Sequence, residues 1–228
     1  MKADNLKLEW EPIFPSIKKG LLKQWIYIDR PTYLIMHEYV TKIDQSVKPI
    51  NDVLEDFSYN DMTIVYLITT IDWIIEGSQQ IASSIRPEIL KGFNFPEENE
   101  YIKACTYFKN LRPFFISHSI NKNEYKKGTL EGEYVFMGIA DELSKNVYIK
   151  LKDHDCCRFI NYDGIFEGAS DESDIYLRCF SRTHENGRYG FGVGVNLKNI
   201  IDAARIALKK VHALDDYASN LKRADFAR

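Results

Sequence analysis

The feature that most constrains this chain is a regular apolar seam between Ile200 and Leu221, near the end of the sequence. Asn196 suits a helix N-cap, because its side chain can accept a hydrogen bond from a backbone N–H of the first turn. Beyond it, apolar residues recur at alternating steps of four and three, the spacing of a coiled-coil seam. The pattern predicts a long helix from Asn196 towards Leu221 that packs along another helix or a second subunit. The seam residues are Ile200, Ala204, Ala207, Val211, Leu214, Ala218 and Leu221.

Three further helices are predicted before residue 120. The first begins at Pro31, and the second runs from Asn60-Asp61 to about Ile85, where Arg86-Pro87 ends it. Pro49 either continues or breaks the first helix. The third begins near Pro96, a residue that suits a first helical position. Its apolar face recurs at steps of three and four, and comprises Tyr101, Cys105, Phe108, Leu111 and Phe115.

The composition changes after Gly128, where alternating apolar residues predict strands. We expect a small antiparallel sheet of three or four strands, with a polar loop at Asp153–Ser173. Asn186-Gly187 is a good hairpin turn between the last two strands. The predicted strands are Glu133–Ile139, Asn146–Lys152, Asp174–Arg182 and Arg188–Val195.

Together these elements predict a mainly α (α+β) fold. We expect an up-and-down helical bundle with a small antiparallel β-sheet inserted before the last long helix. Residues 1–228 are expected to form a single domain, with the β-rich insertion at about 128–195. With 45% hydrophobic residues, the chain can bury a real core.

Charge and cysteine content limit the classes of function. The formal net charge of −3 argues against a broad electrostatic footprint for nucleic acid, although it is compatible with a local basic cleft. Four cysteines, two of them adjacent at Cys156-Cys157, do not form a secreted disulfide framework. The first residues lack the apolar core of a signal peptide, and no apolar run is long enough to span a bilayer. We therefore expect a soluble, cytoplasmic protein with no membrane partner.

The segment Glu98–Asn123 brings a helical pattern, an arginine and a histidine close together. Arg112 lies at the edge of the apolar stripe, and His118 follows six positions later. Six residues of an ideal helix turn the chain by about 600°, which leaves the two side chains about 120° apart. They converge only if the helix bends between them, for which Pro113 gives a reason, or if a second copy supplies the partner.

The wording LRPFFISHSIN, with Arg112 and His118 six residues apart, resembles the RxxxxxH segment of the HEPN superfamily of small helical bundles. Its position, after a buried second helix and before a final helix, favours this Arg/His pair over others of similar spacing. The sequence departs from the family pattern at Pro113, where a polar residue is usual, and at Ser119, where proline is common. The other Arg/His pairs are Arg30/His37, Arg178/His184 and Arg205/His212.

The resemblance implies a metal-independent endoribonuclease of a bacterial defence or toxin-type system, such as toxin–antitoxin or abortive infection. His118 would act as the general base or acid, since its ordinary pKa lies near neutrality. Arg112 would stabilise charge developing on the phosphate. The resemblance further implies RNA as substrate, a homodimer that completes the site, an antitoxin or regulatory partner, and no metal or cofactor.

Other interpretations of the same residues stay open. Arg112 can pair with an acidic neighbour such as Glu76 while His118 caps the helix, in which case the chain is a non-catalytic bundle that binds a partner protein or a nucleotide. A third interpretation is a metal-dependent hydrolase that uses His154 and nearby carboxylates. Adjacent cysteines at Cys156-Cys157 seldom bind one metal well, so a surface loop is favoured there. A strand is favoured over a phosphate-binding loop for Gly190–Gly194.

Overall fold

A computed structural model describes residues 6–14, 20–112, 134–139, 157–167, 173–181 and 190–226. The chain divides into two units. The first comprises Met1–Glu55, Thr70–Ala104 and Asp202–Arg228, and the second comprises Asp56–Thr69 and Cys105–Ile201. Three long helices contribute residues to both units, and each unit is described by itself below. That the chain is one domain stays a prediction.

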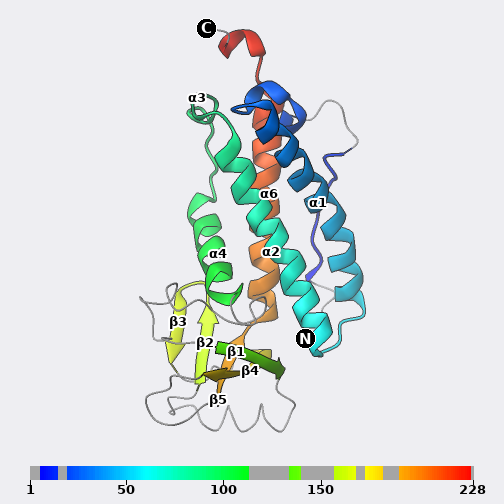
Figure 1. Ribbon diagram of the computed structural model, residues 1–228, viewed down its shortest axis with the longest axis vertical. Helices are drawn as coiled ribbons and strands as arrows, with labels where there is room; N and C mark the ends of the chain where they lie inside the picture. The colour runs from blue at the N-terminus through cyan, green and yellow to red at the C-terminus, as the bar shows by residue number, and fades with distance from the viewer. Residues whose placement is uncertain are drawn as a thin grey trace. The chain divides into compact units, whose positions relative to one another are not determined.

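The long helices form an up-and-down bundle, as the sequence predicts. Helices α1 (Arg30–Glu55), α2 (Asp61–Ser84), α4 (Glu98–Leu111) and α6 (Leu197–Asn220) follow one another in alternating directions (Figure 1). The short α3 (Pro87–Leu90) lies between α2 and α4. A small β-sheet precedes α6. The mainly α fold with a sheet before the last long helix is therefore confirmed.

Local signals explain where α1 and α2 begin. Asp29 Oδ1 accepts a hydrogen bond of 2.8 Å from the backbone N–H of Thr32, which caps α1. Asn60 Oδ1 likewise accepts one of 2.9 Å from Thr63 N, so the predicted cap of α2 is confirmed. Helix α1 continues through Pro49 to Glu55 rather than breaking there.

The amino-terminal segment 6–14 is fastened to α1 through polar side chains of that helix. The carboxylate of Asp44 accepts hydrogen bonds from Trp10 Nε1 at 2.8 Å, from Ile13 N at 3.0 Å and from Phe14 N at 2.8 Å. Asn51 donates to the carbonyl of Leu8 and accepts from its N–H. These contacts satisfy backbone groups of a segment that is neither helix nor strand.

Residues 20–27 pack against the carboxyl-terminal half of α6. The N–H of Leu21 donates to Asp215 Oδ1 at 2.9 Å. The ammonium of Lys23 donates to three carbonyls at the end of α6, at 2.9, 2.8 and 3.2 Å, which satisfies acceptors that a helix end leaves unpaired. Those carbonyls belong to Ala218, Ser219 and Leu221.

A buried lysine on α6 contacts the start of α4. The side chain of Lys210 is only 7% exposed and forms an ion pair with Glu98. Its Nζ lies 4.9 Å from the ring centroids of Phe93 and Phe95, and 5.2 Å from that of Tyr101. Three aromatic faces and one carboxylate thus stabilise a cation that is largely removed from water.

The second unit contains a five-stranded sheet in the order β1-β4-β5-β2-β3. Strands β1 and β5 flank β4 in antiparallel pairings, and β2 pairs antiparallel with β3. In the β4–β5 pairing, Leu177 lies opposite Val193, and both are fully buried. The strands are β1 (Tyr134–Ile139), β2 (Cys157–Asn161), β3 (Gly164–Glu167), β4 (Ile175–Ser181) and β5 (Gly190–Val195).

The sheet differs from the predicted one in two respects. Strand β2 runs parallel to β5, so the sheet is mixed rather than antiparallel. The segment Asp153–Ser173, predicted as a polar loop, contains both β2 and β3. These strands are five and four residues long, too short for an alternating pattern to stand out. The predicted strands Glu133–Ile139, Asp174–Arg182 and Arg188–Val195 are confirmed as β1, β4 and β5, within one or two residues, whereas Asn146–Lys152 and the turn Asn186-Gly187 lie outside the described residues.

The predicted start of α6 is confirmed. Asn196 Oδ1 accepts a hydrogen bond of 2.8 Å from Lys198 N, and Asp174 Oδ2 accepts one of 2.9 Å from Leu197 N. Both acceptors satisfy backbone donors of the first helical turn. Since Asp174 immediately precedes β4 and Asn196 follows β5, the sheet fixes where α6 begins.

The apolar seam of α6 is covered within the chain. Along the part of α6 in the first unit, Ala204, Ala207, Val211 and Leu214 are all fully buried. Burial is wider than a coiled-coil seam, because Ala203 and other residues between the seam positions are buried as well. No helix within the described ranges is long and apolar enough to cross a membrane.

The packing of segment 20–27 yields a stability prediction. A β-carbon at Gly20 would lie 2.3 Å from Ser219 N and 2.4 Å from the carbonyl oxygen of Asp215, both backbone atoms that cannot turn aside. Gly20→Ala should therefore lower the free energy of unfolding by about 2–3 kcal/mol, as measured by urea denaturation. Gly77→Ala is the matched control: its nearest contact is a flexible side-chain atom, Ile43 Cδ1, at 3.1 Å, and it lies within a helix. Equal unfolding midpoints for both variants would contradict the prediction.

Candidate functional site

The carboxyl-terminal end of α4 carries the first residue of the predicted Arg/His pair. Of the predicted apolar face, Phe108 and Leu111 are buried and Cys105 is half-buried, and Tyr107, which the spacing did not include, is buried as well. Arg112 follows with 3-10 geometry and is exposed. A guanidinium at a helix carboxyl end lies where the helix dipole favours a cation. The structure thus places Arg112 at the surface of the second unit, while His118 lies outside the described residues.

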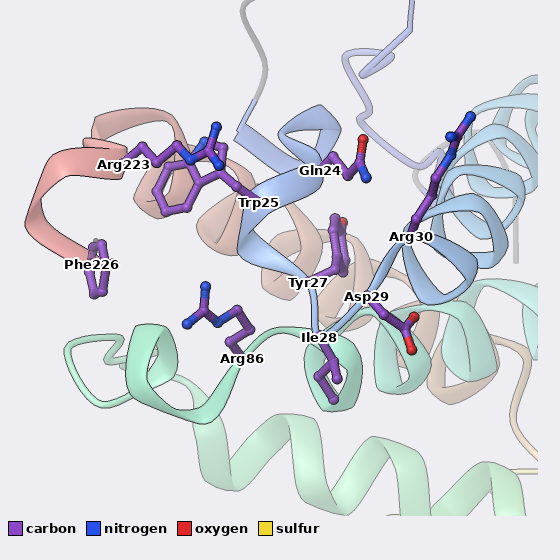
Figure 2. A pocket seen from close by; sticks show the side chains of 9 residues that line it. All are labelled: Gln24, Trp25, Tyr27, Ile28, Asp29, Arg30, Arg86, Arg223 and Phe226. Carbon is purple, nitrogen blue, oxygen red and sulfur yellow. The ribbon is translucent and has the colours of Figure 1, made fainter. Parts of the chain in front are cut away.

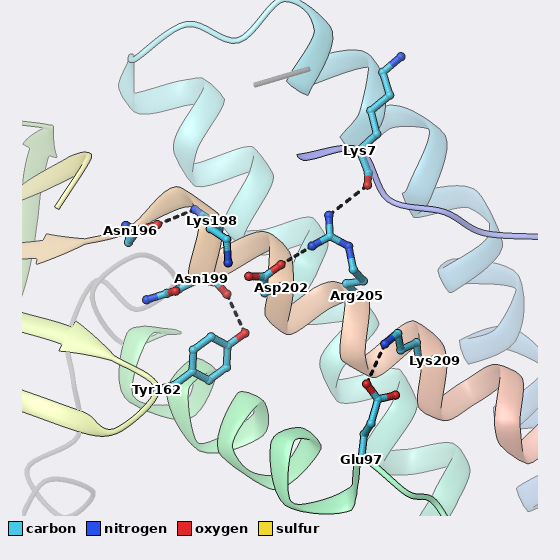
Figure 3. A network of polar contacts seen from close by, with 9 residues as sticks. All are labelled: Lys7, Glu97, Tyr162, Asn196, Lys198, Asn199, Asp202, Arg205 and Lys209. Carbon is cyan, nitrogen blue, oxygen red and sulfur yellow. Dashed lines mark hydrogen bonds and ion pairs between the residues drawn. The ribbon is translucent and has the colours of Figure 1, made fainter. Parts of the chain in front are cut away.

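Tyr107 of α4, which precedes Arg112, stacks on Tyr162 of the turn between β2 and β3. The rings of Tyr107 and Tyr162 are 5.1 Å apart between centroids with an interplanar angle of 26°. The hydroxyl of Tyr162 donates to the carbonyl of Asn199 at 2.9 Å (Figure 3). The stack joins the β2–β3 turn to α4 and to the start of α6, so the end of α4 is held by packing on its inner side. Residue spacing alone gave no signal for this pair, because its members are far apart in sequence.

The hydroxyl of Tyr107 is buried and has no hydrogen-bond partner among the described residues. Burial, reinforced by the nearby Tyr162 phenol, raises the pKa of Tyr107 well above its ordinary value. The group therefore stays protonated, and it is suited to packing rather than to proton transfer near neutrality.

Arg205 and His212, a pair of similar spacing, come together on one face of α6. Seven residues turn a helix by about 700°, close to two full turns, so the two side chains point the same way. Both line a hollow of about 490 Å³ in the first unit, together with Lys7, Trp10 and Lys209. This is the one Arg/His pair that the described side chains bring into a common hollow.

The contacts in this hollow are structural. Arg205 forms an ion pair with Asp202 and donates to the carbonyl of Lys7 at 3.3 Å (Figure 3). The ring of His212 packs against that of Trp10, with centroids 4.2 Å apart and a tilt of 44°. Both side chains therefore hold the amino-terminal segment on α6.

The two lysines of the hollow are paired with carboxylates. Lys7 contacts Glu55 at 2.5 Å. Lys209 contacts Glu97 at 2.8 Å, and Figure 3 shows this second pair. Cations that are already neutralised in this way offer little attraction to a phosphodiester. The Arg205/His212 hollow is therefore a poor nucleic-acid site.

The remaining Arg/His pairs lack a common site in the described structure. His37 packs edge-on against Phe14, with centroids 4.4 Å apart, and lies 6.2 Å from Tyr33, while Arg30 is exposed at the start of α1. Of the pair Arg178/His184, only the backbone of Arg178, in β4, is described.

The two other patterns singled out in the sequence have different outcomes. Gly190–Gly194 lies in β5, so the strand interpretation is confirmed and the phosphate-loop interpretation is wrong. The backbone of Cys157 opens β2, whereas Asp153–Cys156, including His154, lies outside the described residues. Among the described side chains, no group of three or more His, Cys, Asp or Glu residues is placed to hold a metal.

The Tyr107 hydroxyl yields a second stability prediction. Tyr107→Phe removes a buried donor that has no described partner, so the free energy of unfolding should rise by about 1 kcal/mol. Tyr27→Phe is the matched control, because the buried hydroxyl of Tyr27 donates to the carbonyl of Leu21 at 2.7 Å. That substitution should lower the free energy of unfolding by about 1 kcal/mol. Urea denaturation of both variants checks the opposite signs, and a loss for Tyr107→Phe would contradict the assignment.

Comparison of the chain with protein families, with curated proteins and with solved structures gives no match.

Proposed function

We propose that the protein is a HEPN-like, metal-independent endoribonuclease in which Arg112 and His118 form the catalytic pair. The observation that carries the proposal is the place of Arg112, exposed at the end of the third long helix of an up-and-down bundle. Packing roles for Arg205/His212 and for His37 in the rival pairs add support. A bacterial toxin-type or defence role, with an antitoxin or regulatory partner in the cytoplasm, belongs to the same proposal.

The proposed chemistry is transesterification within the RNA strand. His118 takes the proton from a ribose 2′-hydroxyl, whose oxygen attacks the adjacent phosphorus. The bond from phosphorus to the 5′-oxygen breaks, and that oxygen takes up a proton, which leaves 2′,3′-cyclic phosphate and 5′-hydroxyl ends. Arg112 stabilises the charge that develops on the phosphate oxygens, as a planar and permanently charged fork can. Neither step requires a metal ion.

A homodimer is part of the proposal, because the resemblance to the HEPN superfamily implies that paired copies complete the site. A second copy can supply the missing partner. The buried seam residues of α6 already pack within the chain, so the dimer interface would use another surface. The end of α4, where Arg112 is exposed, is the surface that the proposal requires to be near the second copy.

The test is cleavage of mixed RNA in excess chelator by the parent protein, Arg112→Ala and His118→Ala. The parent should produce 2′,3′-cyclic phosphate ends. Each variant should be slower by about a hundredfold or more, since one transition-state donor or one proton-transfer group is lost. Arg112→Lys should recover only part of the rate, because an ammonium keeps the charge but lacks the fork.

Lys109→Ala is the matched control on the same helix, because it removes a neighbouring exposed charge but no proposed catalytic group. It should keep the parent's cleavage rate at saturating RNA. An inactive parent that is folded would overturn the ribonuclease proposal. Cleavage that appears only when metal is returned would overturn it in favour of a metal-dependent reaction near His154.

A further inference from the structure

A pocket in the first unit is lined by three arginines and three aromatic rings. It has a volume of about 520 Å³, within the range of small-molecule sites. Its walls come from three separate segments of the chain (Figure 2): residues 24–30, Arg86 just before α3, and the 3-10 helix Arg223–Phe226. Because no local pattern unites these segments, the sequence gives no sign of the pocket.

The aromatic side chains give the pocket flat apolar surfaces. The rings of Trp25 and Phe226 are 6.0 Å apart between centroids and tilted by 34°. Both are half-buried, so part of each ring faces solvent. Tyr27 is buried, and its hydroxyl is already bonded to Leu21. Half-exposed rings of this kind are surfaces on which a planar ligand can stack.

The cations of the pocket lie beside these rings. Figure 2 shows Arg86 reaching towards Trp25 and Phe226, with Arg223 next to Trp25. Arg86 donates through Nε to Glu88 Oε1 at 2.7 Å, so part of its charge is shared. Arg223 is exposed and has no carboxylate partner among the side chains that the structure describes. At least one complete guanidinium fork is therefore available for an anion.

The pocket lining contains fewer acidic than basic side chains. Asp29 is the one carboxylate of the lining, and it accepts a hydrogen bond from Thr32 N at the start of α1. Hydrogen bonding by the side chain of Thr32, together with its backbone N–H, lowers the pKa of Asp29, so the group is charged near neutrality. Even with the nearby Glu88 included, the three lining arginines leave a positive balance. The amino-terminal end of α1 adds the positive pole of a long helix.

From this juxtaposition we infer that the pocket binds a nucleoside monophosphate. The planar base stacks on Trp25 and Phe226, and the phosphate accepts hydrogen bonds from Arg223 and Arg86. A phosphate monoester carries close to two negative charges near neutrality. It therefore suits two guanidinium groups better than a ligand carboxylate does, because a carboxylate carries one charge. The inference does not rest on the ribonuclease proposal, because no pocket residue belongs to the Arg112/His118 pair.

Calorimetric titration of the full chain with adenosine, guanosine, cytidine and uridine 5′-monophosphates tests the inference. At least one should bind saturably. Its unphosphorylated nucleoside and inorganic phosphate should each bind about tenfold more weakly or not at all, because each engages only the rings or only the arginines. Absence of saturable binding by all four nucleotides would overturn the inference. Equal binding of inorganic phosphate and nucleotide would overturn the stacking part.

Two variants and a matched control locate the site. Arg223→Ala and Phe226→Ala should each weaken nucleotide binding by about tenfold. The exposed Lys222 is adjacent in sequence but outside the lining, so Lys222→Ala should bind as the parent does. Since Arg223 is exposed, its removal should not unfold the chain, and circular dichroism checks this. Unchanged binding by both pocket variants would overturn the assignment.

A nucleoside 5′-monophosphate occurs both as a free nucleotide and as the 5′-phosphorylated end of an RNA strand. Titration with a short oligoribonucleotide carrying a 5′-phosphate, and with its 5′-hydroxyl form, distinguishes the two sources. Preference for the phosphorylated strand supports the pocket and assigns the strand end as its ligand. Binding of the mononucleotide without either strand supports it and assigns the free nucleotide. Arg112→Ala, which should slow cleavage, should leave mononucleotide binding unchanged, so each proposal can fail without the other.

Discussion

The first unit depends on holding one ammonium ion almost out of water. Lys210 lies on α6, which has many buried residues, and removing its charge from water is costly unless other groups replace the lost hydration. Glu98 supplies the opposite charge, and Phe93, Phe95 and Tyr101 supply ring faces. All four belong to the segment that leads into and begins α4. The contacts of the lysine therefore join α6 to that segment.

Most of the helical framework could be predicted, because its signals are repeated along the chain. The α6 seam contains seven apolar residues at regular spacing, and caps such as Asn60 and Asn196 mark where helices begin. Buried polar residues such as Lys210 and Asp215 could not be recognised as core from the sequence. The groups that offset the cost of burying them are distant in sequence. Strands β2 and β3 escaped prediction for a different reason: each is too short to display its alternation.

The candidate site was only partly predictable. A spacing of seven places an arginine and a histidine on one face of any helix, as Arg205 and His212 show, whether or not they do chemistry. Such a pair is informative only when its packing partners are known, and here Trp10 and Asp202 reveal a structural role. Arg112 has the exposure that a catalytic role needs. The aromatic and arginine-lined pocket had no sequence signal, because tertiary contacts alone assemble it.

The contact between Gly20 and the end of α6 also determines when the first unit can finish folding during synthesis. Gly20 and Leu21 leave the ribosome early, yet their packing surface includes Asp215 and Ser219, nearly two hundred residues later. Until those residues emerge, the glycine, the N–H of Leu21 and the ammonium of Lys23 lack their native contacts. The first unit therefore completes its folding only after α6 has been translated. Until then, the apolar residues of its early segments lack their native packing partners.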